Sequence, residues 1–163
     1  PLSIVYLAAV IGSGDDKATM EVQRAVEGNM PALVGADTTY TYVYVKDAAD
    51  AIVKTLLKED AIGKSYLVGK ERATTREYFN LIGEIADVNI PKYNIPGKLL
   101  IPIAKVMEKT SRITGKRPEL PLDVLKTTMA GSLLFDASYA ERELSLNYTP
   151  LRVALEDAVS DFQ

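Results

Sequence analysis

Apolar positions in the first seventy residues gather into short runs of the kind that form strands. Residues 3–11 are almost all apolar and rich in β-branched side chains, and Gly12 and Gly14 follow them. A run of this kind predicts a strand that is buried on both faces, as in a parallel sheet covered by helices. Residues 40–45 and 65–69 have the aromatic and β-branched composition of two further strands.

Between and after these runs, apolar residues recur at steps of three and four, which predicts amphipathic helices. One helix is expected after residues 15–16, and a second is expected to be capped by Asp47. A third opens with Thr74 and Glu77, which have the spacing of a capping box. The alternation of strands and helices up to residue 88 indicates an α/β fold.

The pattern changes after Pro91. Helices are predicted over about 97–113, 121–130, 137–144 and 150–162, and strand signals are almost absent. We therefore expect residues 1–90 to form the last strands and helices of a doubly wound parallel sheet, with residues near 16–40 joining a smaller lobe. Residues 91–163 are expected to form that mainly helical lobe together with a C-terminal helix.

The predicted sheet has too few strands to pair a doubly buried strand on both edges. Unpaired edges of such a strand invite association with other chains. We expect the neighbouring strands to come from a preceding N-terminal half that is absent from this chain.

The composition says little about the fold, but it excludes several kinds of partner and catalytic group. The 163 residues are 47% hydrophobic and 25% charged, with a net charge of −3. The basic residues form no stripe, so we expect no nucleic-acid partner, and no apolar run is long enough to span a membrane. The absence of cysteine and histidine excludes thiolate catalysis and removes the usual metal ligands, so no metal site is expected. A cytoplasmic location fits this composition.

Several ordered motifs resemble one enzyme family. The loop at 9–15 is similar to that family's Pro-Ile-Gly-Pro-x-Asp loop, and residues 42–51 are similar to its Val-His-Val-Asp-Asp-Val-Ala segment. Residues 115–118 resemble its Gly-Arg-Arg-Pro turn, and 135–144 resemble its closing Phe-Asp-Ser-Ser segment. Together they resemble the C-terminal half of extended short-chain dehydrogenases, in particular the dihydroflavonol-reductase-like and epimerase group.

The resemblance implies an α/β chain that forms the C-terminal part of a Rossmann-type fold with a substrate-binding lobe. It also implies that the parent protein reduces a ketone or epimerises a sugar nucleotide with NAD or NADP, most of which the absent half would bind. A small-molecule substrate is the expected partner, and a homodimer is left open. A non-catalytic cofactor-sensing or scaffold relative on the same fold is the alternative.

By this resemblance, the segment Ala8, Ala9, Val10 and Gly12 would border the nicotinamide end of the cofactor. Ala8 and Ala9 replace the Ser or Thr that often contacts the carboxamide in the family, which favours the sensor alternative. Gly12 lacks the third glycine of a dinucleotide-binding turn. A simple strand-ending turn is therefore the competing interpretation.

Candidate substrate-binding residues are Tyr42, Tyr44, Lys116, Arg117 and Met129. The two tyrosines share one face of a strand, where phenols offer apolar area and a polar tip, although a sheet face covered by a helix or by the second lobe is the favoured competing interpretation. Lys116 and Arg117 could meet a substrate phosphate, but a solvated turn is the competing interpretation, and Met129 is either core or a pocket lid.

No catalytic residue is expected in this chain. The family uses a Tyr-x-x-x-Lys pair on a helix, in which the lysine lowers the tyrosine pKa. Tyr42 with Lys46 and Tyr66 with Lys70 have this spacing. Both pairs lie in predicted strand regions, where four residues span about 13 Å and hold the two groups apart. We therefore expect this chain alone to be inactive and to bind NAD(P) weakly or not at all.

Overall fold

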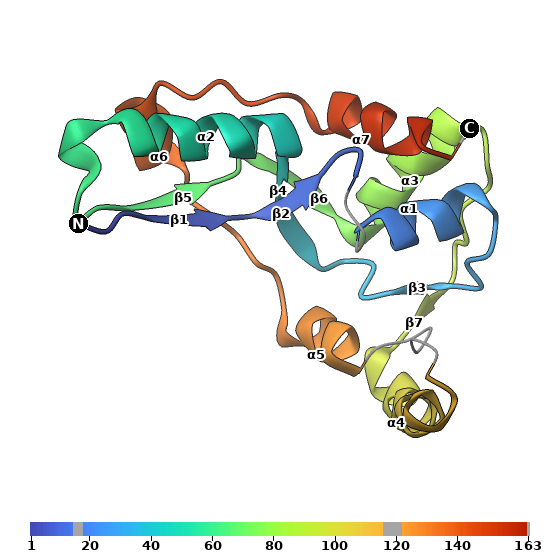
Figure 1. Cartoon of the computed structure of the whole chain (residues 1–163). Coiled ribbons are helices and arrows are strands. Elements are labelled where there is room, and N and C mark those ends of the chain that lie inside the picture. The colour runs from blue at the N-terminus through green and yellow to red at the C-terminus, as the bar shows by residue number, and fades with distance from the viewer. Residues whose placement is uncertain (15–17, 116–121, 163) are drawn as a thin grey trace.

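The computed structural model describes residues 1–14, 18–115 and 122–162 and has an α/β body with a helical hairpin below it (Figure 1). In chain order the elements are β1 (Ile4–Leu7), β2 (Ala9–Ile11), α1 (Ala18–Val26), β3 (Leu33–Val34), β4 (Thr39–Tyr44), α2 (Val45–Leu57), a short 3-10 helix (Glu59–Ala61), β5 (Ser65–Val68), β6 (Glu71–Thr74), α3 (Thr75–Ala86), β7 (Asn94–Ile95), α4 (Gly97–Thr114), α5 (Leu122–Ala130), α6 (Ser138–Leu144) and α7 (Leu151–Ser160).

The strands of the body pair mainly in parallel. β1 runs parallel to β5, β2 runs parallel to β4, and β6 lies antiparallel on the other edge of β4. The run 3–11, expected to be one strand, divides at Ala8 into β1 and β2, which pair with different neighbours. The Ala8 N–H still donates to the Val68 carbonyl at 2.9 Å, so the two strands remain nearly continuous.

One apolar core lies between β2, β4 and the helices α1, α3 and α7. Burial of apolar surface of this extent is the main driving force for folding. Among the described residues, Ile82 of α3 and Leu155 of α7 are fully buried there. This core fixes α1 and β4 relative to each other, and both elements carry residues of the candidate site.

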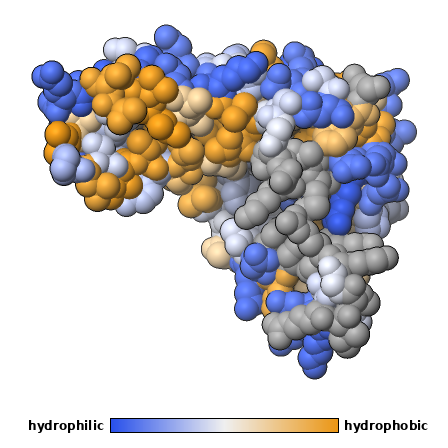
Figure 2. Space-filling model, viewed as in Figure 1, coloured by the Kyte–Doolittle hydropathy of each residue, from blue (hydrophilic) through white to orange (hydrophobic). Residues whose placement is uncertain are grey.

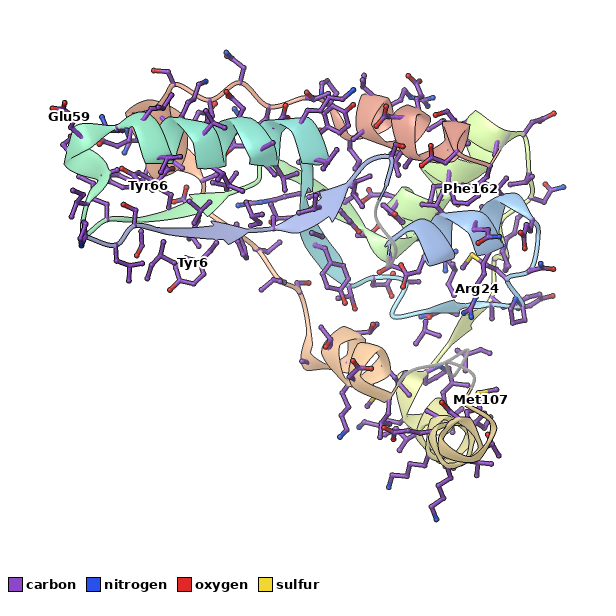
Figure 3. The ribbon with its side chains drawn as sticks, in the orientation of Figure 1. Tyr6, Arg24, Glu59, Tyr66, Met107 and Phe162 are labelled. Atoms are coloured by element: carbon purple, nitrogen blue, oxygen red, sulfur yellow. The ribbon has the colours of Figure 1, made fainter. Side chains whose placement is uncertain are left out.

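A second core lies where α2 and α6 cover one face of β1 and β5. Tyr66, Val68 and Ala51 are completely buried in it. The opposite face of the same two strands is open: Tyr6 is 49% exposed and Leu67 is 39% exposed. Figure 2 shows hydrophobic surface gathered over this end of the molecule, and Figure 3 shows Tyr6 pointing away from α2.

The prediction of a strand buried on both faces is therefore wrong for the described residues. The burial of β1 alternates between exposed and half-buried positions because helices cover one face only. In addition, no described strand pairs with the edge of β1 that faces away from β5. This edge and the open face leave apolar groups and backbone hydrogen-bonding groups available to further polypeptide.

The helices α4 and α5 form a hairpin below the body, joined to it near the short β3–β7 pair (Figure 1). Ala104 and Leu125 are the described residues of the hairpin that are fully buried, and Met129 packs against Gly97 at the start of α4. Pro102 lies inside α4, as its sixth residue, and has no N–H to donate to the carbonyl of Lys98 one turn earlier. None of the described helices combines the length and apolar character that crossing a bilayer requires.

Two local predictions have different outcomes. Thr74 and Glu77 form the expected capping box of α3. Asp47 does not cap α2, because the helix begins at Val45 and has Tyr44 at its N-cap. The Asp47 carboxylate instead accepts hydrogen bonds from the backbone N–H and the hydroxyl of Thr149, at 2.6 and 3.0 Å. It thereby ties α2 to the segment before α7.

Candidate functional site

A pocket of about 1050 Å³ lies between the α/β body and the hairpin. Its upper wall comes from α1, the end of β2 and β4, and its lower wall comes from α4 and α5. Arg24 of α1 and Met107 of α4 lie on opposite sides of it (Figure 3). The volume is in the range of small-molecule and cofactor sites, which are usually largely apolar with a few polar groups.

Tyr42 projects from β4 into the wall of this pocket. Its ring stacks on Tyr78 of α3, with 5.1 Å between the ring centroids and 7° between the planes. Burial raises the pKa of Tyr42 well above its ordinary value, and the nearby Glu21 carboxylate adds to this effect. The phenol therefore stays protonated near neutral pH, where it is suited to hydrogen bonding and not to proton abstraction.

Glu21 lies in the first turn of α1 and also lines the pocket. The residue is exposed to solvent at the pocket, while the surrounding protein atoms partly desolvate its carboxyl. This desolvation raises the pKa of Glu21, and Arg24, one turn later on α1, acts in the opposite direction. The carboxylate makes no hydrogen bond to any described residue, so it can accept one from a ligand.

The segment expected to border a cofactor divides into two parts. Ala9 and Val10 line the pocket. Ala8 is buried against Gly69, where an added Cβ would approach the Ala8 side chain to 2.4 Å. Gly12 has a φ of 148°, and a Cβ there would lie 2.5 Å from Val45. Gly12 is thus required by packing within the protein, which favours the strand-ending turn.

The loop that contains Gly12 has the glycines of a phosphate cradle but not its free donors. Backbone N–H groups in such loops must be available to bind the anion. Here the Ser13 N–H donates to Asp157 at 3.1 Å and the Gly14 N–H donates to Asp161 at 3.3 Å. The Ser13 N–H in turn lowers the pKa of Asp157. Two carboxylates already occupy these donors, so the loop does not fit a pyrophosphate, whereas the apolar Ala9 and Val10 fit the flat face of a nicotinamide.

The remaining candidate substrate residues are dispersed. Tyr44 is buried beside Lys46, whose Nζ lies 5.2 Å from the Tyr44 ring centroid, and it does not line the pocket. Met129 packs on Gly97 within the hairpin and is likewise absent from the described lining. Lys116 and Arg117 lie outside the described residues. Their roles in substrate binding stay predictions.

Neither Tyr-x-x-x-Lys match has the geometry of a catalytic pair. Tyr42 is on β4 and Lys46 is in the first turn of α2, where it lies over the ring of Tyr44. Tyr66 is on β5, and the Lys70 ammonium bonds with Glu141 at 2.7 Å. Neither pair shares a helix, so the structure offers no lysine that would lower the pKa of its tyrosine partner.

Sequence reasoning did not single out Glu21, Arg24, Tyr78 and Thr128, which the structure brings together with Tyr42 around the pocket. Tyr78 is 36 residues from Tyr42 in sequence, and nothing in the pattern predicts that their rings stack. Glu21 has the position of an ordinary acidic residue in the first turn of a helix. Among the described residues there is no group of His, Cys, Asp and Glu that could hold a metal ion.

An α/β body with a pocket between the carboxyl end of β2 and a helical lobe is typical of enzymes that bind nucleotide cofactors. No family model matches the chain. A putative dihydroflavonol 4-reductase from Synechocystis sp. is 31% identical over 169 residues, which cover 98% of this chain and 48% of that relative. The crystal structure of gox2253 has a TM-score of 0.75 and 28% identity over 99% of this chain and 49% of that one.

A more distant structure shares the fold. UDP-glucuronic acid 4-epimerase from Bacillus cereus, solved in complex with UDP-glucuronic acid and NAD, has a TM-score of 0.68 and 18% identity. This chain covers 44% of that epimerase. The chain belongs to the extended short-chain dehydrogenase/reductase family, also called the NAD(P)-dependent epimerase/dehydratase family. It spans about half the length of the relatives that it matches.

Proposed function

We propose that this chain is the substrate-binding part of an NAD(P)-dependent oxidoreductase or epimerase that acts on a ketone or a sugar nucleotide. The observation that carries this proposal is the pocket of about 1050 Å³ between the body and the hairpin. Family membership and the dihydroflavonol 4-reductase relative support it. An enzyme of this type moves a hydride between the cofactor and a carbon that carries a hydroxyl or carbonyl oxygen.

In this proposal the residues of the chain position the substrate. Ala9 and Val10 of β2 form an apolar wall against which the nicotinamide would lie. Tyr42 donates a hydrogen bond from its protonated phenol to a substrate oxygen. The hairpin then closes the pocket from below through Leu100, Ile103 and Met107, which exclude water from the bound substrate.

The remaining functions fall to polypeptide beyond this chain. The described residues provide neither a phosphate cradle nor a helical Tyr-x-x-x-Lys pair. In the proposal, the half of the relatives that this chain does not match provides both. The open edge of β1 and the exposed Tyr6 and Leu67 are where that half would pair and pack.

A non-catalytic cofactor sensor on the same fold is a second candidate. The observation in its favour is the apolar character of the cofactor-facing segment, in which Ala8 is buried against Gly69 and Ala9 offers no polar side chain. A sensor would bind the cofactor without turning over a substrate. Turnover of a carbonyl substrate by the intact gene product separates the two candidates.

The substrate pocket is tested by NMR titration of the ¹⁵N-labelled chain with dihydroquercetin, an uncharged hydroxylated ketone, and with UDP-glucuronic acid. We expect at least one of these ligands to shift the amide signals of α1, β4 and α5. Tyr42→Phe should weaken that binding about five- to tenfold, because a buried hydrogen bond contributes roughly 1 kcal/mol or more. Tyr6→Ser, on the open face of β1, is the control that should leave it unchanged. Shifts from neither ligand would refute the proposed pocket.

A further inference from the structure

The charged side chains around the pocket are predominantly acidic. Within the part of the chain that the structure describes, Glu21, Glu27 and Asp123 line it together with one basic residue, Arg24. A site that binds a nucleoside diphosphate normally offers several cationic groups or free backbone N–H donors to the phosphates. The Gly12–Gly14 loop does not add such donors, because Asp157 and Asp161 already accept from it.

Among these carboxylates, Glu21 is the one placed to contact a ligand that also contacts Tyr42. It lines the same pocket as Tyr42 and lies close enough to the phenol for its charge to affect that group, and Tyr42 pairs in register with Ala9, the first residue of β2. Glu27, by comparison, accepts hydrogen bonds from Gln23 and Asn29 on the rim. Glu21 makes no hydrogen bond to the described residues, so its carboxylate is the acceptor that a ligand beside Tyr42 would meet.

We propose that Glu21 is a specificity-determining residue that accepts a hydrogen bond from a hydroxyl group of an uncharged substrate and excludes ligands that carry phosphate. This inference rests on the proposed function, because it assumes that the pocket holds the substrate. The pair of Tyr42 as donor and Glu21 as acceptor matches a compound with a carbonyl and a nearby hydroxyl. A second negative charge in the same pocket would be repelled by these carboxylates.

The chain contains no cysteine, which permits a direct measurement of the charge in the pocket. In an Ala9→Cys variant, the single thiol reacts with two disulfide reagents: 4,4′-dithiodipyridine, which is neutral, and 5,5′-dithiobis(2-nitrobenzoate), which carries two carboxylates. The ratio of the two rates reports the local potential, because both reactions depend on the same fraction of thiolate. Substrate and cofactor are not needed for this readout.

Adding Glu21→Gln to Ala9→Cys should raise the ratio of anionic to neutral rate about fivefold at low salt, and the gain should shrink at high salt. Glu59→Gln removes the same charge from the short 3-10 helix that follows α2 (Figure 3) and should change the ratio less than twofold. In the ligand titrations, wild type should bind dihydroquercetin more tightly than UDP-glucuronic acid. Glu21→Gln should weaken the former about tenfold.

Equal changes for Glu21→Gln and Glu59→Gln would overturn the role of Glu21, as would tighter binding of UDP-glucuronic acid than of dihydroquercetin by wild type. These results would leave the substrate pocket itself in place. A thiol at position 9 that reacts with neither reagent would instead show that the pocket is closed. That outcome would overturn the proposed function together with this inference.

Discussion

The α/β body and the α4–α5 hairpin are built on different amounts of buried apolar surface. The body has two cores, with Ile82, Leu155 and Tyr66 completely or almost completely removed from solvent. In the hairpin, the described residues Ala104 and Leu125 are fully buried, while Leu99 is 66% exposed. Since burial is the main source of stability, the body should hold its geometry independently, whereas the hairpin depends on a few contacts.

Because the two parts differ in buried surface, the body wall of the pocket is suited to orienting a ligand and the hairpin wall to admitting it. Tyr42 and Ala9 belong to the rigid body, and Glu21 lies on a helix that packs on α3 and α7. The opposite wall, with Met107 and Thr128, belongs to the hairpin. A wall fixed by the body that carries Tyr42 and Glu21, facing a hairpin wall that opens more easily, allows a ligand to enter without disturbing the groups that orient it.

The largest expected effect is on the body. Ile82→Ala removes a fully buried side chain from the core under α3 and should lower the free energy of unfolding by about 3 kcal/mol. Urea denaturation followed by circular dichroism measures this change. Val153→Ala, at a position 46% exposed on α7, is the control and should change stability by less than about 0.5 kcal/mol. A similar loss for both variants would contradict the assignment of the core.

Leu125→Ala tests the hairpin in the same way, but its effect should be local. We expect faster hydrogen–deuterium exchange in α4 and α5, with exchange in β4 and α3 unchanged, because the hairpin can open without unfolding the body. Leu99→Ala, on the exposed side of α4, should leave exchange as it is. Uniformly faster exchange across the whole chain would show that body and hairpin unfold as one unit.

The capping box of α3 should contribute less than either core residue. The Thr74 hydroxyl accepts from the Glu77 N–H at 3.1 Å, and the Glu77 carboxylate accepts from the Thr74 N–H at 2.7 Å. Thr74→Ala should cost about 1 kcal/mol in thermal or urea denaturation, whereas Thr74→Ser should restore most of it. If serine fails to rescue stability, the hydroxyl is not the stabilising group.

The smallest effect concerns Glu21 and pH. Burial raises the pKa of Glu21 above its ordinary value of 4.5, so the folded protein holds this proton to higher pH than the unfolded chain does. The corresponding stability is complete below pH 4.5 and is lost as pH rises through the folded pKa. Glu21→Gln should abolish that decline above pH 4.5 in urea denaturation, whereas Glu59→Gln should preserve it. An identical pH profile for Glu21→Gln and wild type would contradict the burial of this carboxyl.

Much of the fold was predictable because the spacing of apolar residues in a long segment distinguishes a helix from a strand. The helix predicted over 97–113 is α4, and the strand predicted over 40–45 is β4. The strands β3 and β7 were missed because segments of two residues have no measurable period, and β6 was missed because its sequence Glu-Arg-Ala-Thr has no apolar run. The division of residues 3–11 at Ala8 depends on two different pairing partners, which composition does not report.

The site was less predictable than the fold. Tyr42 was identified from its place on a strand, and Ala9 and Val10 were identified by resemblance to the family. Glu21 was missed, because its proximity to Tyr42 arises only when α1 packs over β4. The sequence alone could not decide whether the loop at Gly12 binds phosphate or only ends a strand, because the answer again depends on residues distant in the chain. The carboxylates that occupy its N–H groups come from α7 and its end, more than 140 residues later.

The central claim is that this chain provides a substrate wall but no cradle for a dinucleotide, and the affinity of the purified chain for NADPH tests it most directly. Fluorescence titration of NADPH against the chain should show no saturable binding up to about millimolar concentration, because the described loop N–H groups are already occupied and the described residues form no cationic phosphate site. Saturable binding with a Kd below about 10 μM would contradict the account and place a complete cofactor site within these 163 residues.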